Sequence, residues 1–164
     1  MMRDREVFRY HVDFGGGDRD VVSLLDPDWI SQHGLHPEAV MAVVTRSADP
    51  RHPLPADIHE NGPFLRLLSR TIFESIDQCD AVRHEAQIQG SGHVYLLDGR
   101  IPDPGGRVAS EDVIGTIEVQ DGKLVAGTYQ HNTRHRLFTA NGWFRLPVEI
   151  ETALLNRLRA RTGA

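Results

Sequence analysis

Cysteine, lysine and long apolar runs are all scarce in this sequence of 164 residues. Cys79 is the only cysteine, so a disulfide within the chain is impossible, and we expect a reducing, cytoplasmic setting. The longest apolar run, residues 39–44, falls far short of the roughly 18 residues that a membrane-spanning helix needs. The first residues carry charges and lack the apolar stretch of a signal peptide, so we expect neither a membrane protein nor an exported one.

Nearly all of the basic side chains are arginines: the sequence has 17 arginines and one lysine, Lys123. This bias, with abundant Gly, Ala, Pro and Asp, indicates a bacterial source with a GC-rich genome. The 40% hydrophobic and 25% charged residues are those of an ordinary soluble globular protein. A chain of this length can bury a core without disulfides or a structural metal, so we expect a single globular domain over residues 1–164.

The net charge of −5 is unevenly distributed along the chain. Residues 1–122 carry 11 basic and 21 acidic side chains, whereas residues 123–164 carry 7 basic and 2 acidic ones. An acidic chain lacks the positive field that phosphate binding needs, so we expect no nucleic-acid partner. Two interpretations stay open: folding mixes the two charges, or the C-terminal part forms a basic surface for an anion or a protein partner, including a second copy. In the second case, self-association should weaken as salt rises.

The first third of the chain predicts a hairpin followed by a short helix. Strand-like residues 7–14 and 21–25 flank a glycine-rich turn, Asp26 is placed to cap a helical turn, and Gly34 is placed to end it. Residues 39–44 fit a buried strand or a buried helix, and we favour a strand. Residues 47–62 read as a connector without secondary structure, either a lid or a crossing loop, because prolines punctuate this region at Pro50, Pro53, Pro55 and Pro63.

Two amphipathic helices are predicted, over about 63–78 and 147–161. The first shows an apolar stripe formed by Phe64, Leu65, Leu67, Leu68, Ile72, Phe73 and Ile76. In the second, acidic residues near the start and arginines near the end complement the helix dipole. A further helix over about 80–89 and a strand over 93–98 stand between them.

The most specific local pattern is a hairpin closed by Asp121-Gly122, because this pair supplies the positive φ angles of a type I′ turn. It joins strands over 113–120 and 123–130, and places Val119 opposite Leu124, Ile117 opposite Ala126, and Ile114 and Tyr129 on the other face. A second turn is predicted at Asn141-Gly142. The fold class is therefore α+β, with an antiparallel or mixed sheet built from hairpins.

Familiar catalytic motifs are incomplete in this sequence. Gly15-Gly16-Gly17 lacks the spacing of a dinucleotide-binding loop, Gln89-Gly90-Ser91-Gly92 is not a nucleophile elbow, and His59-Glu60 does not complete a zinc-peptidase motif. Cys79 has no C-x-x-C partner and fits a structural thiol. We therefore expect no cofactor and no metal.

One cluster of side chains is a candidate binding site, formed by Tyr129, His131, Arg134, His135 and Arg136. The arginines could hold a carboxylate or phosphate through bidentate hydrogen bonds, with the imidazoles beside them. A metal held by the two histidines is a weaker alternative, because Asn132 and Thr133 favour a turn and the arginines would repel a cation. Solvent exposure or structural hydrogen bonding is the plain alternative. The polar loop at residues 100–107 could lie near this cluster.

Two classes of function follow. We favour a non-catalytic binding or regulatory protein, which acts through a protein partner or by self-association. The reason is that the spacing of residues along the chain does not indicate a nucleophile, a general base and an oxyanion site in one place. The alternative is a small enzyme or ligand-binding domain for an anionic metabolite, in which His131 or His135 is the general acid or base and Arg134 or Arg136 orients the substrate. Convergence of these side chains in a pocket, with a carboxylate orienting one imidazole, would favour the second class.

Overall fold

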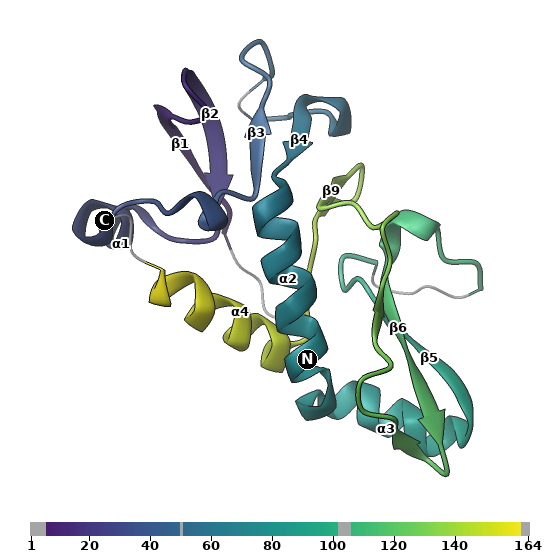
Figure 1. Cartoon of the computed structure of the whole chain (residues 1–164). Helices are drawn as coiled ribbons and strands as arrows, with labels where there is room; N and C mark the ends of the chain where they lie inside the picture. The colour runs from purple at the N-terminus through teal and green to yellow at the C-terminus, as the bar shows by residue number, and fades with distance from the viewer. Residues whose placement is uncertain (1–5, 50, 102–105, 162–164) are drawn as a thin grey trace. The chain divides into compact units, whose positions relative to one another are not determined.

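The structure is a computed structural model and describes residues 6–49, 51–101 and 106–161. Its contacts divide into two compact units: among the described residues, the first contains residues 6–68 and 154–161, and the second contains residues 69–153. Both units combine helices with antiparallel strands, so the α+β class is confirmed (Figure 1). The expectation of a single domain stays a prediction.

The first unit is built on a four-stranded antiparallel sheet in the order β1-β2-β3-β4. The predicted hairpin is confirmed as β1 (Phe8–Asp13) and β2 (Asp18–Ser23). The predicted short helix is α1 (Pro27–His33), where Asp26 accepts a hydrogen bond from the Trp29 backbone N–H at 2.8 Å. Gly34 ends α1 with a φ of 78°, a conformation that glycine adopts without strain.

Residues 37–60 contain more regular structure than the prolines indicate. The segment predicted as a strand contains a 3-10 turn, η1 (Pro37–Ala39), and then the strand β3 (Ala42–Val44). The expected connector without secondary structure is wrong, because it contains η2 (Pro55–Asp57) and the strand β4 (Ile58–Glu60). Proline is tolerated at the start of a 3-10 turn. The strand β4 itself contains no proline, so its backbone N–H groups can take part in the pairing with β3. Pro50 lies outside the described residues.

The two predicted amphipathic helices are α2 (Gly62–Ser75), which continues as the 3-10 turn η3 (Ile76–Gln78), and α4 (Val148–Ala160). The boundary between the two units falls within both helices. The placement of Phe73 in the apolar stripe is wrong, because its side chain is 49% exposed. Phe73 follows Phe64 by nine residues, which is two and a half helical turns, so it points away from the buried face.

The second unit contains α3 (Asp80–Gln89), which packs against the sheet formed by β5 (Gly92–Leu97), β6 (Val113–Gln120) and β7 (Lys123–Leu124). The predicted helix and strand in this stretch are confirmed. The short strand β8 (Gln130–His131) also pairs with β6, and the turn η4 (Ser110–Asp112) precedes β6. Val94, Leu96, Ile117 and Val119 are buried on the side of the sheet that faces α3.

The register of the Asp121-Gly122 hairpin is correct only next to its turn. Val119 pairs with Leu124 as predicted, but the pairing of Ile117 with Ala126 is wrong. The chain leaves the ladder after Leu124 and returns with Gln130 opposite Thr116, a shift of three residues. This shift places Tyr129 in the core, although the predicted register placed it on the outer face.

The second predicted turn is displaced by one residue. The hairpin of β9 (Phe138–Thr139) and β10 (Gly142–Trp143) pairs Thr139 with Gly142, so its loop is Ala140-Asn141 rather than Asn141-Gly142. Gly142 still carries a positive φ, of 99°, at the start of β10. No helix in the described part of the chain is long and apolar enough to span a membrane.

Candidate functional site

The predicted cluster lies on the segment that leaves β8. This segment is not a helix, as expected from Asn132 and Thr133. The Asn132 side chain donates hydrogen bonds to the backbone oxygens of Ser110 and Val113, both at 2.8 Å, and accepts one from the Arg134 backbone N–H at 3.1 Å. A single asparagine therefore fixes the turn that separates the two histidines.

Tyr129 is buried against a glycine. A Cβ atom at Gly115 would clash with the Tyr129 ring and lie 2.6 Å from the backbone oxygen of Gln130. The Tyr129 hydroxyl lies 2.9 Å from Nδ1 of His131 and 3.4 Å from the backbone oxygen of Ile114. Burial raises the pKa of Tyr129, so this residue is a neutral hydrogen-bonding group rather than an ionised one.

His131 is held as a neutral imidazole near pH 7. Burial, and to a lesser degree the nearby His135, lower the pKa of His131 from 6.5 to about 4. The centroids of these two rings are 6.5 Å apart. Because His131 carries no charge near neutral pH, it contributes no positive field for an anion there.

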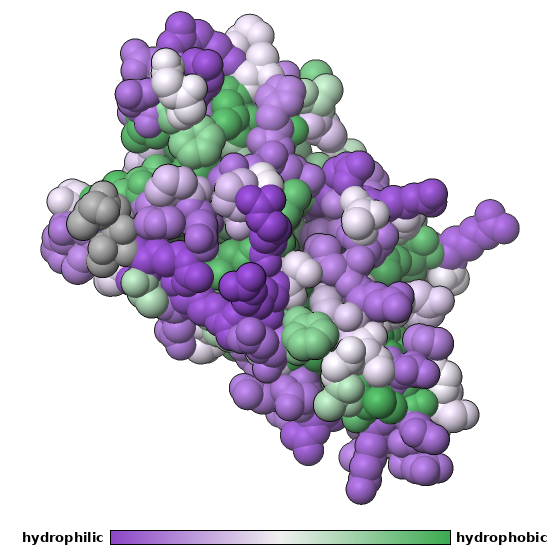
Figure 2. Space-filling view, viewed as in Figure 1, coloured by the Kyte–Doolittle hydropathy of each residue, from purple (hydrophilic) through white to green (hydrophobic). Residues whose placement is uncertain are grey.

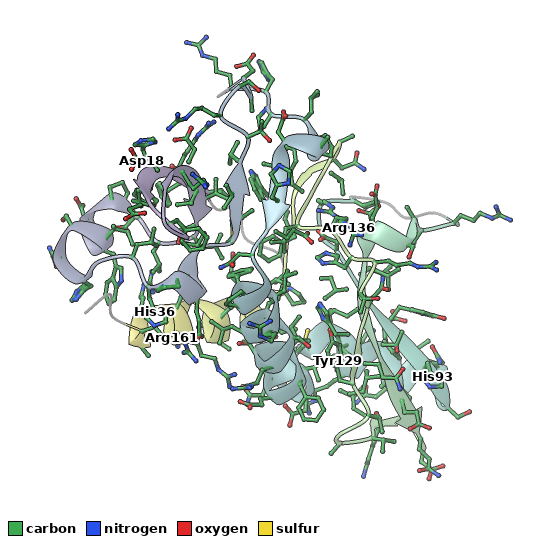
Figure 3. The ribbon with its side chains drawn as sticks, turned by 45° about the horizontal axis from the view of Figure 1, so that its top comes forward. Asp18, His36, His93, Tyr129, Arg136 and Arg161 are labelled. Atoms are coloured by element: carbon green, nitrogen blue, oxygen red, sulfur yellow. The ribbon has the colours of Figure 1, made fainter. Side chains whose placement is uncertain are left out.

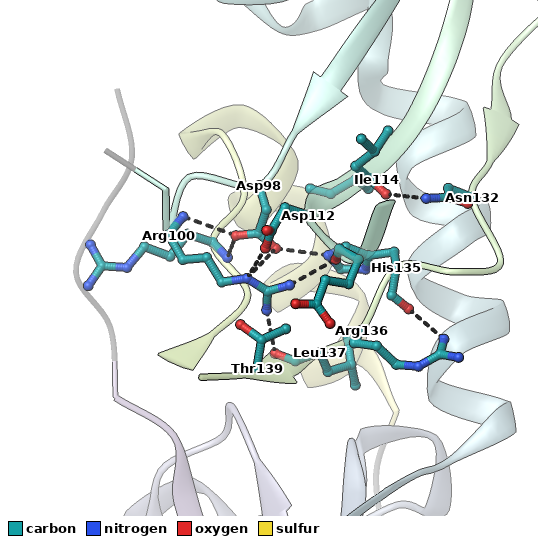
Figure 4. Close-up of polar contacts among 12 residues, drawn as sticks. Asp98, Arg100, Asp112, Ile114, Asn132, His135, Arg136, Leu137 and Thr139 are labelled. Carbon is teal, nitrogen blue, oxygen red and sulfur yellow. Dashed lines mark hydrogen bonds and ion pairs between the residues drawn. The ribbon is translucent and has the colours of Figure 1, made fainter. Parts of the chain in front are cut away.

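His135 is buried and belongs to a polar network (Figure 4). Its Nε2 atom lies 2.8 Å from Oδ2 of Asp98, and the carboxylate accepts this hydrogen bond, so Nε2 carries the hydrogen. The other oxygen of Asp98 accepts hydrogen bonds from the backbone N–H groups of Arg100, at 3.0 Å, and Arg145, at 2.9 Å. A carboxylate thus does orient one imidazole of the cluster, but inside the protein rather than in an open pocket.

Arg100 completes this network, and all three nitrogens of its guanidinium donate hydrogen bonds. Its Nε donates to Asp112 at 2.9 Å, and its terminal nitrogens donate to the backbone oxygens of Glu111, Leu137 and Gly142 at 2.9–3.3 Å. The side chains of Asp98, Arg100 and Asp112 are at most 2% exposed. The expected proximity of the polar loop to the cluster therefore holds for Arg100, whereas its Asp103-Pro104-Gly105 portion lies outside the described residues.

The two arginines of the cluster, Arg134 and Arg136, are exposed, and Figure 3 labels Arg136. Arg136 donates from a terminal nitrogen to the backbone oxygens of Thr133 and His135, both at 3.1 Å. Neither Arg134 nor Arg136 lines the pocket of about 360 Å³ that His131 borders together with Tyr95, Ser110 and Thr116. The structure brings Tyr129 and His131 together, buries His135 against Asp98, and leaves both arginines exposed outside the pocket that His131 borders.

Sequence reasoning assigned no role to Asp98 and Asp112. Asp112 stands 12 residues from the arginine that it pairs with, and Asp98 stands 37 residues from His135, so spacing along the chain shows neither pair. The available signal was the placement of an acid and a base, Asp98 and Arg100, directly after an apolar strand.

The described residues contain no group of three or more histidine, cysteine or acidic side chains that could hold a metal ion. Cys79 is buried, and burial raises the pKa of its thiol, which keeps the sulfur in its unreactive form. This agrees with a structural thiol.

A second feature of the same unit is the outer edge of β5. Among the described strands, β5 pairs with β6 alone. On β6, Glu118 directs its N–H to Thr128 and its C=O to Val125, both on the side away from β5. His93 and Glu118 are therefore a non-hydrogen-bonded pair, and the alternation of an antiparallel ladder makes Tyr95 and Thr116 another.

It follows that the N–H and C=O groups of Tyr95 point outward from the sheet. The contact from the Gln89 side chain to the backbone oxygen of His93, at 2.7 Å, shows the same direction two residues earlier. No hydrogen bond to the outward backbone groups of Tyr95 is found within the described part of the chain. The Tyr95 side chain is 61% exposed.

A groove runs beside this edge, between β5 and α3. Its volume is about 440 Å³, and its walls include Ala81, Glu85 and Gln89 of α3 and Val94, Tyr95 and Leu97 of β5. Figure 2 shows green, apolar surface surrounded by hydrophilic residues at the lower right, where these elements lie in Figure 1. The unit therefore presents unpaired strand backbone beside a largely apolar wall.

The chain matches no protein-family model, no curated protein and no solved structure. Its function therefore has to be inferred from the geometry of the chain itself.

Proposed function

We propose that this is a non-catalytic, cytoplasmic binding protein that recognises an extended segment of a protein partner at the outer edge of β5. The observation that carries the proposal is the unpaired backbone of Tyr95 beside the groove between α3 and β5. A bound strand would add to the sheet through main-chain hydrogen bonds, and its alternate side chains would enter the groove.

The chemistry of the groove specifies the segment further. Its walls are mostly apolar, and Glu85 is the acidic side chain among them. We expect the bound segment to be extended, with apolar side chains at alternate positions and a basic residue near Glu85.

The state of the predicted cluster supports a non-catalytic role. The guanidinium nitrogens of Arg100 bind Asp112 and backbone oxygens, and Nε2 of His135 binds the buried Asp98 carboxylate, so these atoms are unavailable to a substrate. Within the described residues, His131 contacts the Tyr129 hydroxyl and has no carboxylate partner, and a general base usually needs such an orienting group.

A second candidate function is binding or conversion of an anionic small molecule at the pocket that His131 borders. It is favoured by the shared lining of this pocket, because the His131 imidazole and the hydroxyl groups of Ser110 and Thr116 are hydrogen-bonding groups for a polar ligand. Native mass spectrometry of gently purified protein tests it. A retained mass that disappears in the His131→Ala variant would support this candidate.

The main proposal is tested with a library of linear peptides displayed on phage and selected against the whole protein. Enriched peptides are then titrated by calorimetry against the wild type, Tyr95→Pro and Tyr95→Thr. Proline removes the outward N–H of Tyr95 without touching the ladder to β6, whereas threonine keeps that N–H and a strand-forming side chain.

We expect binding to fall at least about tenfold in Tyr95→Pro and much less in Tyr95→Thr. Hydrogen exchange should also slow at Tyr95 and Leu97 when peptide is bound. Failure to enrich any peptide, or equal binding by the proline variant, would contradict the proposal.

A further inference from the structure

We infer that, without a partner segment, the outer edge of β5 pairs with the same edge of a second copy of this chain, forming a two-fold symmetric dimer. This inference rests on the proposed function, because it names an occupant of the same edge. Its test uses oligomeric state and no peptide, so the two can fail independently.

The outward backbone groups of β5 are self-complementary. His93, Tyr95 and Leu97 alternate with residues that bond to β6, and Tyr95 is the middle one of the three. In an antiparallel pair centred on Tyr95, the N–H of each Tyr95 donates to the C=O of the other. His93 then lies opposite Leu97 at both ends, and the sheets of the two copies become continuous.

This edge lacks the features that normally keep strand edges apart. Exposed edges are commonly protected by lysine, by proline or by inward-pointing charge. Residues 91–97 contain no proline and no Asp, Glu, Lys or Arg, so a two-fold pair brings no like charges opposite each other. The ladder irregularity in β5 lies between Leu96 and Leu97, at the end of the edge rather than in its middle.

Exposed side chains on β5 would also gain a partner. The two Tyr95 rings, each 61% exposed in the single chain, would face each other across the two-fold axis on the same side of the sheet. Directly opposed residues have Cβ atoms about 5.5 Å apart, which suits an aromatic pair. His93 would meet Leu97 on that face at each end.

The structure also limits the strength of this dimer. The Gln89 side chain already donates to the backbone oxygen of His93, so that oxygen has one remaining lone pair for the partner. A contact made by one strand of six residues is small beside the standard protein interface. We therefore expect association in the micromolar to millimolar range, which leaves the edge open to exchange with a partner segment.

The experiment is sedimentation velocity of the full chain from about 1 µM to 1 mM, with Tyr95→Lys, Tyr95→Glu and Tyr95→Thr measured beside the wild type. The two-fold axis places residue 95 opposite itself, so lysine or glutamate should each repel its own copy. Mixing the lysine and glutamate variants pairs opposite charges at the same position. Circular dichroism and urea unfolding of each variant establish that it is folded.

We expect the wild type to approach twice its 18.4 kDa mass at high concentration and both charged variants to stay monomeric. An equimolar mixture of the two should associate at least about tenfold more tightly than either variant alone. Tyr95→Thr should still dimerise, more weakly than the wild type. A wild type that is monomeric throughout, charged variants that dimerise like the wild type, or a mixture that shows no recovery would each overturn the inference.

Discussion

Several buried polar side chains in the second unit are held by more than one hydrogen bond. Asp98 accepts from His135 and from two backbone N–H groups, and Arg100 is bound to Asp112 and to three backbone oxygens. Leaving one member of such a network without its partner costs more than the net worth of a hydrogen bond, because the remaining group stays buried. These residues therefore join the loops around β9 and β10 to the end of β5.

Replacing His135 should destabilise the fold. His135→Ala removes a hydrogen bond from the buried Asp98 carboxylate, and we expect a loss of about 1–3 kcal/mol in the free energy of unfolding. Urea denaturation measures it, with His93→Ala as the control, because His93 is exposed. Equal stability of the two variants would contradict the structural role.

Gly115 should tolerate no side chain. In Gly115→Ala the new methyl group would clash with Tyr129 and lie 2.6 Å from the Gln130 backbone oxygen, which cannot move without disturbing the pairing of β8 with β6. We expect a destabilisation of about 1–3 kcal/mol. In the matched control Gly17→Ala, the methyl group meets the flexible end of the Arg19 side chain. Thermal unfolding of both variants should therefore show a clear loss for Gly115→Ala alone.

The neutral state of His131 makes stability depend on pH. Its pKa is about 4 in the folded protein and near 6.5 when the chain is unfolded, so between these values the unfolded chain binds more protons. Stability should fall as the pH drops through this window, by about 1 kcal/mol between pH 7 and pH 5 after allowing for partial exposure.

The check is urea denaturation at both pH values in the wild type and in His131→Gln, which cannot titrate. The variant should show a smaller loss of stability on acidification than the wild type. A loss of the same size in both proteins would show that other groups cause the pH dependence.

At the scale of elements, the sheet of the second unit depends on a short loop that interrupts β7 and β8. Thr128 joins its two ends: its hydroxyl accepts from the Glu118 backbone N–H at 3.0 Å and donates to the Val125 backbone oxygen at 2.7 Å. Gly127 supplies the positive φ, of 78°, that the loop requires. The Thr128 hydroxyl thus takes the place of a backbone acceptor for the Glu118 N–H group.

Thr128→Val keeps the shape of the side chain but removes both contacts. We expect a loss of about 1 kcal/mol in stability, and faster hydrogen exchange at the Glu118 amide in particular. Thr133→Val serves as the control, because Thr133 is exposed in the following turn. Unchanged exchange at Glu118 would contradict this role of the Thr128 hydroxyl.

At the scale of the whole molecule, two origins of self-association can be separated by salt. Contact between the acidic part and the basic C-terminal part of different copies would weaken as salt rises. Pairing through β5 uses backbone groups and uncharged side chains, so it should change little between about 50 and 500 mM salt. Light scattering over this range tests both, and a dimer that dissociates in high salt would favour the charge-driven contact.

The sequence predicted elements wherever one short-range rule decides the local conformation. Asp26 and Gly34 bracket α1, Asp121-Gly122 closes its hairpin, and the 3.6-residue period locates α2 and α4. The sequence did not predict β4, because a strand of only three residues forms when another strand, here β3, lies beside it. The three-residue shift of β8 likewise depends on the packing of Tyr129 over Gly115.

The candidate site shows the same division. The sequence by itself determined that Tyr129, His131 and His135 come close together, since few residues separate them. Only the tertiary structure decided that Asp98 links His135 and Arg100 in one buried network, that Arg134 and Arg136 are exposed, and that the edge of β5 stays open. Burial and pairing between distant segments cannot be read from spacing, because they depend on which surfaces the folded chain brings together.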